Sequence, residues 1–127
     1  MTTIKAYTTI EQSKKLAEFL PLDTADQCFL NDGTAIKAEI NSYSVAMKLW
    51  KEHYIEIIPC WSLTALLEFL RNRHDCNYVT LTSNKASLWC LRASYYNHVW
   101  EDAEEVSEDA VDACVKMIIK LNELKML

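Results

Sequence analysis

The sequence has little glycine and little proline. Among its 127 residues, glycine occurs only at Gly33 and proline only at Pro21 and Pro59. Loops that hold nucleotide phosphates need several closely spaced glycines, because the backbone itself approaches the phosphate oxygens. The sequence therefore excludes glycine-rich phosphate loops of both the dinucleotide-binding and the P-loop kind.

Long apolar runs and runs of positive charge are also absent. No apolar segment approaches the roughly 20 residues that a membrane-spanning helix needs. The net charge is −5 and the longest basic run is Lys14-Lys15, whereas a nucleic-acid binder needs a positive surface that displaces counterions from phosphates. We expect a soluble protein whose partners are neither membranes nor nucleic acids.

The cysteines do not follow a disulfide or zinc pattern. There are five, at Cys28, Cys60, Cys76, Cys90 and Cys114, and no two are spaced as CxxC. A secreted protein usually pairs its cysteines and begins with an apolar leader, which the first residues do not resemble. Structural zinc needs four ligands, usually two close pairs, and only His74 and Cys76 form such a pair. We expect reduced thiols, a cytoplasmic location, no metal and no other cofactor.

Composition and length favour an ordinary globular protein. Half of the residues are hydrophobic and 24% are charged, as in typical soluble domains. A chain of 127 residues suits one domain, so residues 1–127 are predicted to form a single domain. The pattern predicts the α+β class, with an antiparallel sheet of about four to five strands built from hairpins and about three helices packed on it.

Helix signals occur near both ends of the chain. Thr9 and Gln12 have the spacing of a capping box, and Pro21 ends the helix that follows, because proline disfavours the helical conformation of the residue before it. The last helix is predicted from near Ser107 to near Leu124. It has an apolar stripe, acidic residues in its first turns and lysines later.

The central helix has the clearest start signal in the chain. The hydroxyl of Ser62 is suited to accept a hydrogen bond from a backbone amide of the first helical turn. Trp61 precedes this cap and is expected to pack on Leu66 as a hydrophobic staple. We predict that this helix continues to about Asn72.

The first predicted hairpin joins residues 27–30 to residues 34–40. Asp32-Gly33 lies between them, and this pair favours the tight turn because both residues tolerate a positive φ. In the second strand Ile36, Ala38 and Ile40 alternate with polar and small residues, so one face is apolar.

The remaining segments give weaker signals. Residues 78–82 and 87–93 are predicted to form a second hairpin, and residues 95–100 a further strand. Residues 54–58 have a strand pattern that we expect Pro59 to end. Residues 41–53 fit either a short helix or an edge strand. Residues 101–108 are expected to form an acidic loop.

Three segments resemble proteins of one family. They are residues 12–21, an IPxWSLxALL segment at residues 58–67 and a DACVxMIIKLxEL segment at residues 112–124. In these segments the chain resembles small uncharacterised proteins encoded in bacterial prophages and mobile elements. The resemblance spans nearly the whole chain and implies an accessory protein of a mobile element. It carries no activity and no catalytic residues.

Aromatic and acidic residues gather after the second hairpin. Tryptophan and tyrosine are favoured at protein interfaces, where charged rims steer the partner. We therefore predict an interaction surface formed by Trp89, Tyr95, Tyr96, Trp100, Glu101, Asp102, Glu104 and Glu105. Its partner is another protein or a second copy of the chain, as in a homodimer. The alternative is that the aromatic rings belong to the core and the carboxylates form a solvated face.

A second hypothesis is a small enzyme or ligand-binding domain. It places a cleft near His74, Cys76 and His98, because an imidazole beside a thiol lowers the thiol pKa and makes a nucleophile. The alternative is that His74 is an ordinary loop residue and that Cys76 is structural. No catalytic residues are assigned from the sequence, and a non-enzymatic interaction protein is the first hypothesis.

The cysteine pattern gives a prediction about folding. Because the thiols are expected to be free and no metal site is expected, thermal melts with and without a reductant, and with and without a chelator, should superimpose. A large fall in the melting temperature with either reagent would show that a disulfide or a metal holds the fold.

Overall fold

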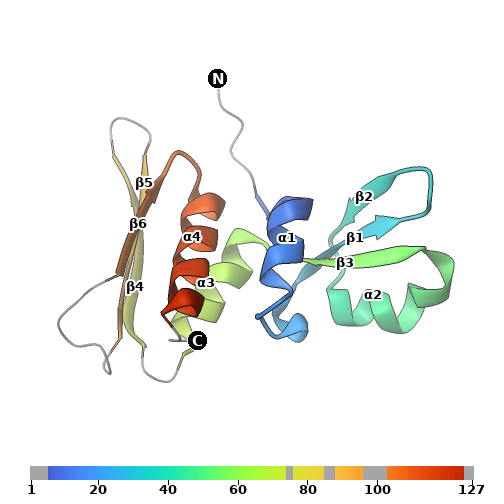
Figure 1. Cartoon of the computed structure of the whole chain (residues 1–127), viewed down its shortest axis with the longest axis horizontal. Helices are drawn as coiled ribbons and strands as arrows, with labels where there is room; N and C mark the ends of the chain where they lie inside the picture. Colours follow the sequence, from blue (N-terminus) through green and yellow to red (C-terminus); the bar gives the residue numbers. More distant parts are fainter. Residues whose placement is uncertain (1–5, 74–75, 85–87, 96–102, 125–127) are drawn as a thin grey trace. The chain divides into compact units, whose positions relative to one another are not determined.

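Figure 1 shows a computed structural model of the chain, which describes residues 6–73, 76–84, 88–95 and 103–124. The described residues form four α-helices and two three-stranded antiparallel sheets. The α+β class is thus confirmed, although the strands form two sheets and the helices exceed the expected three. Two compact units result: residues 7–65 make up the N-terminal unit, and the chain from Leu66 onward makes up most of the C-terminal unit. The single domain stays a prediction.

The N-terminal unit is built on a sheet in the order β2-β1-β3. These strands are β1 (Gln27–Asn31), β2 (Ile36–Glu39) and β3 (Glu56–Cys60), and both pairings are antiparallel. Helix α1 (Ile10–Leu16) packs against β3, and helix α2 (Tyr43–Trp50) packs against β3 and β1 (Figure 1). The central strand is therefore β1, and β2 and β3 are the edges.

Alternate residues of β1 belong to two separate apolar clusters. Leu30 packs with Ala46 of α2, whereas Phe29 packs with Ile58 and with Ile10 of α1. Successive side chains of a strand point to opposite faces, so α1 and α2 contact opposite faces of this sheet. The capping box of α1 is present as predicted, with Thr9 and Gln12 bonded to each other's backbone N–H.

The turn that joins β1 to β2 has Gly33 and Thr34 at its centre, one residue later than the predicted Asp32-Gly33 pair. Gly33 has a φ of 94°, a conformation that other residues rarely adopt. The carboxylate of Asp32 accepts hydrogen bonds from the Thr34 hydroxyl at 2.7 Å and from the backbone N–H groups of Thr34 and Ala35 at 2.8 and 2.9 Å. These bonds, the Thr34 hydroxyl foremost, stabilise the charged form and lower the pKa of Asp32 to about 2. The first hairpin is thus confirmed.

Three expectations for this unit change or are decided. Pro21 does not end the first helix, because α1 already ends at Leu16. Pro59 does not end the third strand, because β3 continues through it to Cys60. A proline is tolerated there since β3 lies at the edge of the sheet, where the missing N–H faces away from the neighbouring strand. Residues 41–53, left open between helix and strand, form α2 and a short 3-10 helix at Lys51–His53. Ser42 caps α2 by accepting from the Val45 N–H.

Trp61 joins three segments of the N-terminal unit. Its side chain is fully buried, and its indole N–H donates to the Thr24 hydroxyl at 2.9 Å. Its backbone N–H donates to the hydroxyl of Thr8 at 3.2 Å, and its carbonyl accepts from the Thr8 N–H at 2.9 Å. The buried hydroxyls of Thr8 and Ser13 bond to each other at 2.7 Å. The polar groups that this tryptophan buries are therefore paired.

Ser62 caps the central helix, α3 (Leu63–Arg71), as predicted. Its hydroxyl accepts from the Ala65 N–H at 3.1 Å and donates to the carboxylate of Asp26. Its backbone N–H also donates to Asp26, at 2.9 Å. The cap is thus tied to the residue that directly precedes β1. The expected packing of Trp61 on Leu66 stays a prediction.

The C-terminal unit contains a sheet in the order β4-β5-β6. Its strands are β4 (Cys76–Ser83), β5 (Trp89–Tyr95) and β6 (Ala103–Ser107), and both pairings are antiparallel. Helix α4 (Ala110–Glu123) packs against β5 and β6, on one face of the sheet (Figure 1). The second predicted hairpin is confirmed by the pairing of β4 with β5.

The stripe on α4 is buried largely as the helical period predicts. Its fully or nearly fully buried residues are Ala110, Val111, Ala113, Cys114, Val115, Met117, Ile118 and Leu121. Leu124, a candidate for the end of this stripe, is 58% exposed, because it lies beyond the last helical turn.

Two expectations near the end of the chain were wrong. The acidic segment 101–108 is not a loop throughout, because Ala103–Ser107 forms β6 and pairs with β5. The helix begins after Asp109, whose carboxylate accepts from the Asp112 N–H, and not near Ser107. Charged residues are compatible with a strand that lies at a sheet edge. Of the strand predicted at residues 95–100, Tyr95 ends β5 and the rest lies outside the described residues.

The contacts of Ser62 and Trp61 predict two losses of stability. Ser62→Ala removes a helix cap and should lower the free energy of unfolding by about 1–2 kcal/mol. Trp61→Ala should lower it by about 3–5 kcal/mol, because a large buried side chain leaves a cavity. Urea melts of both variants measure these values. Ser44→Ala, at an exposed position of α2, is the control and should change the stability by less than about 0.5 kcal/mol.

Candidate interaction surface

Only part of the predicted aromatic and acidic surface belongs to the described residues. Tyr96, Trp100, Glu101 and Asp102 lie outside them, and of Tyr95 only the backbone is described, as the last residue of β5. The described side chains are therefore those of Trp89, Glu104 and Glu105. Trp89 is half-buried at the start of β5.

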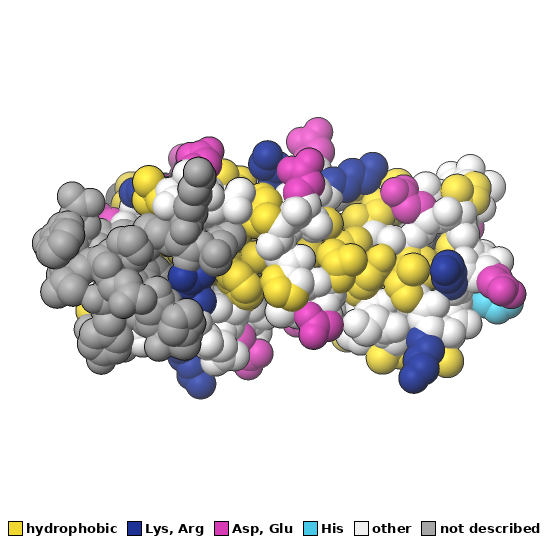
Figure 2. All heavy atoms as spheres, turned by 60° about the horizontal axis from the view of Figure 1, so that its bottom comes forward, with side chains coloured by type: hydrophobic (Ala, Val, Ile, Leu, Met, Phe, Trp, Pro, Cys, Tyr) yellow, Lys and Arg dark blue, Asp and Glu magenta, His cyan; other side chains and the backbone are white. Residues whose placement is uncertain are grey.

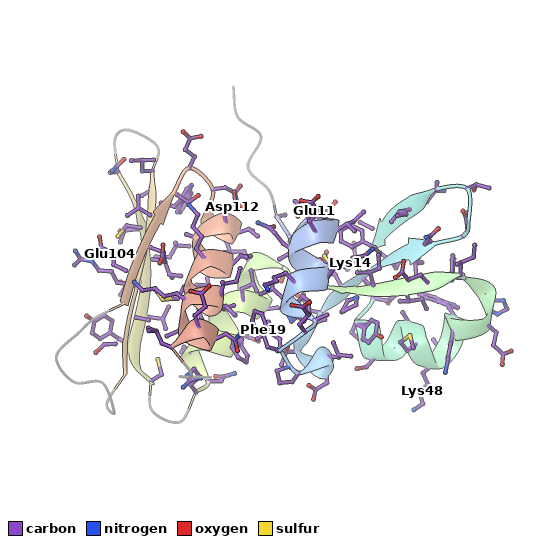
Figure 3. All side chains as sticks on the ribbon, viewed as in Figure 1. Glu11, Lys14, Phe19, Lys48, Glu104 and Asp112 are labelled. Carbon is purple, nitrogen blue, oxygen red and sulfur yellow. The ribbon has the colours of Figure 1, made fainter. Side chains whose placement is uncertain are left out.

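The two described carboxylates of this set lie on opposite faces of the sheet. Glu105 pairs in register with Leu91, which is fully buried, and its carboxylate lies 3.7 Å from the ammonium of Lys120 on α4. Glu104 pairs with Arg92 in register, and its carboxylate accepts a hydrogen bond from the Arg92 guanidinium Nε at 2.9 Å. Figure 3 shows Glu104 pointing away from α4. These two residues do not form one acidic patch, and the larger surface stays a prediction.

Of the three residues of the hypothetical cleft, only Cys76 belongs to the described residues. His74 and His98 lie outside the described residues, and Cys76 is a half-buried residue at the start of β4. Within the described part of the chain, no three His, Cys, Asp or Glu residues are grouped so as to hold a metal ion. The cleft stays a prediction.

Three of the cysteines are poor nucleophiles. Burial raises the pKa of Cys28 to about 11 and that of Cys114 to about 12, with smaller contributions from nearby acidic groups. Burial also raises the pKa of Cys60, against hydrogen bonds from neighbouring hydroxyls that lower it. The thiolate is the reactive form, so these three side chains are structural.

The sequence did not indicate that apolar residues at one edge of the N-terminal sheet are exposed. Strand β2 and the residue that follows it present Ile36, Lys37, Ala38, Glu39 and Ile40, here called the β2 edge surface. Ile36 is 43% exposed and Ile40 is 82% exposed. Figure 2 shows the side that lies at the bottom of Figure 1, where hydrophobic side chains also reach the surface beside separate acidic and basic groups. The apolar face expected for this strand is therefore largely uncovered.

Pairing with β1 assigns the residues of the β2 edge surface to two faces. Ala38 lies opposite Phe29, on the face contacted by α1, and Ile36 shares that face because it is two residues away. Lys37 lies opposite Leu30 and Glu39 opposite Cys28, on the face contacted by α2. Apolar side chains and a pair of opposite charges thus flank the same free edge.

The backbone of β2 presents hydrogen-bonding groups to this edge. The Asp32 N–H donates to the Ala35 carbonyl, so these two residues form a hydrogen-bonded pair of the hairpin. Such pairs alternate along an antiparallel ladder, which makes Lys37 and Glu39 the next residues that bond to β1. The N–H and carbonyl groups of Ile36 and Ala38 consequently point away from β1. No strand among the described residues pairs with them.

A local signal for this surface exists in the sequence. Ala38 is the centre of the segment Ile36-Lys37-Ala38-Glu39-Ile40. An isoleucine lies two positions away on each side of it, and the two adjacent residues carry opposite charges. Alternation alone predicts an apolar face that some other element buries. It does not reveal that the face is left open.

The comparisons with known proteins identify no relative. No protein-family model, no curated protein and no solved structure matches the chain. Among the described residues, no helix is both long enough and apolar enough to cross a membrane. The resemblance to proteins of prophages and mobile elements therefore stays an expectation.

The burial of the thiols predicts their reactivity. When the folded protein is treated with iodoacetamide at pH 8, Cys28, Cys60 and Cys114 should remain unmodified over times that label the half-buried Cys76 and Cys90. Peptide mass spectrometry with and without urea measures this difference. Rapid labelling of Cys60 in the folded protein would indicate an accessible, activated thiol and would favour the enzyme hypothesis.

Proposed function

We propose that the protein is a non-enzymatic protein-interaction module and that it binds through the β2 edge surface. The observation that carries this proposal is the combination of a free strand edge with the exposed Ile36 and Ile40. An accessory role in a prophage or mobile element belongs to the same proposal, and it rests on the segments that resemble such proteins. The buried, high-pKa thiols argue against a thiol enzyme.

A free strand edge is a template for a further strand. Its unpaired N–H and carbonyl groups supply main-chain hydrogen bonds, and alternate side chains of the added strand supply specificity. Proteins commonly protect such edges with proline, charges or a covering element. Here β2 contains two charged residues, Lys37 and Glu39, and no proline, and its apolar residues Ile36 and Ala38 are exposed. The partner expected from this chemistry is an extended segment with alternating apolar side chains.

A site-specific cross-link tests the proposal. The full-length chain is expressed with a photoreactive benzoylphenylalanine in place of Ile40, and the products are identified by mass spectrometry. We expect one discrete cross-linked protein. The same probe in place of Lys48, an exposed residue that points away from the sheet (Figure 3), should give no such product.

A variant that blocks the edge is the second part of this experiment. Ala38→Pro removes an N–H that faces away from β1, so the bonds within the hairpin are kept. The discrete product should disappear in this variant, and folding is checked by circular dichroism. If Ala38→Pro does not fold, Ile36→Asp takes its place, because Ile36 is 43% exposed and position 40 carries the photoreactive residue. A product that persists in the folded edge variant, or no product at all, would overturn the proposal.

A further inference from the structure

We infer that the strand bound by β2 is β2 of a second copy of this chain, antiparallel to it about a twofold axis at Ala38. This inference rests on the proposed function and names its partner. Three features of the β2 edge surface support it: the order of its charges, the direction of its backbone groups and the position of its isoleucines.

The charges are complementary to themselves. When two antiparallel copies of β2 meet at Ala38, Lys37 of each copy lies opposite Glu39 of the other. Both residues lie on the face contacted by α2, so each opposite pair is on the same side of the joined sheet. Opposite charges at directly facing positions stabilise antiparallel strands, and like charges destabilise them. The Glu39 carboxylate receives one hydrogen bond, from the Asn41 amide at 3.2 Å, and keeps capacity for a lysine.

The backbone selects the same register. The groups of Ile36 and Ala38 that point outward must meet outward-pointing groups of the second copy, so the register changes in steps of two positions. One step in one direction places Lys37 opposite Lys37, and one step in the other places Glu39 opposite Glu39. Like charges disfavour both alternatives. The register centred on Ala38 makes a hydrogen-bonded pair of the two central alanines.

The isoleucines supply the apolar part of the contact. In this register Ile36, which shares the face of Phe29, lies opposite position 40 of the other copy, and Ile40 directly follows β2. Their exposed fractions are 43% and 82%, so both have apolar surface to bury. Burial of apolar surface favours association. The contact is short, and small interfaces are typical of weak complexes, so we expect a dissociation constant in the micromolar range, of about 1–100 μM.

Reversal of the charges tests the register. Sedimentation velocity of the purified full-length chain should show a monomer–dimer equilibrium. Lys37→Glu places glutamates opposite each other at both symmetric positions, and Glu39→Lys does the same with lysines. Each change should raise the dissociation constant about tenfold or more, because two attractive pairs become repulsive. The double variant should restore the dimer to within about threefold of the wild type.

Two further measurements complete the test. Lys48→Glu and Glu52→Lys make the same changes of net charge at exposed positions outside the β2 edge surface, and they should leave the dissociation constant unchanged. An equimolar mixture of the two single variants should form mixed dimers more tightly than either variant dimerises alone. Association that responds equally to the control variants, or single variants that dimerise like the wild type, would overturn the inference.

The failure of this inference differs from the failure of the proposed function. If the wild type is monomeric up to about 1 mM while position 40 cross-links to a different protein in an edge-dependent manner, self-pairing is wrong and strand addition stands. If the chain is monomeric and position 40 gives no product, both are wrong. A cross-link from position 40 of one copy to the segment around Ile36 of a second copy supports both.

Discussion

The burial of Trp61 is the contact on which the N-terminal unit depends. The side chain follows β3 directly, and its hydrogen bonds reach Thr24 in the 3-10 helix Leu22–Thr24 and Thr8 before α1. An indole of this size contributes several kcal/mol when it is buried, and its N–H must be paired for that gain to be kept. The next residue, Ser62, begins α3 and binds Asp26. One short stretch of chain thus sets the ends of a strand and of a helix.

This arrangement leaves the other edge of the same sheet without cover. Helices α1 and α2 pack on the faces of β1 and β3, and the contacts that anchor the sheet lie at the Trp61 end. Strand β2 is held by β1 and by the turn in which Asp32 binds Thr34 and Ala35. The apolar side chains of β2 therefore stay exposed.

The cysteines illustrate how a reactive side chain becomes inert through its surroundings. Cys28 belongs to the cluster with α2, and Cys114 lies on the buried stripe of α4. Burial penalises the thiolate and raises the pKa in both cases, so each acts as a small apolar residue.

The sequence by itself determined the features that depend on residues a few positions apart. The capping box at Thr9, the cap at Ser62 and the turn at Gly33 follow from local hydrogen bonds and backbone preferences, and all three are present. Only the tertiary structure decided that Pro59 continues a strand and that Ile36 and Ile40 stay exposed. Whether a strand lies at an edge, and whether an apolar face is covered, depends on elements distant in the sequence. The pattern of neighbouring residues does not specify these distant elements.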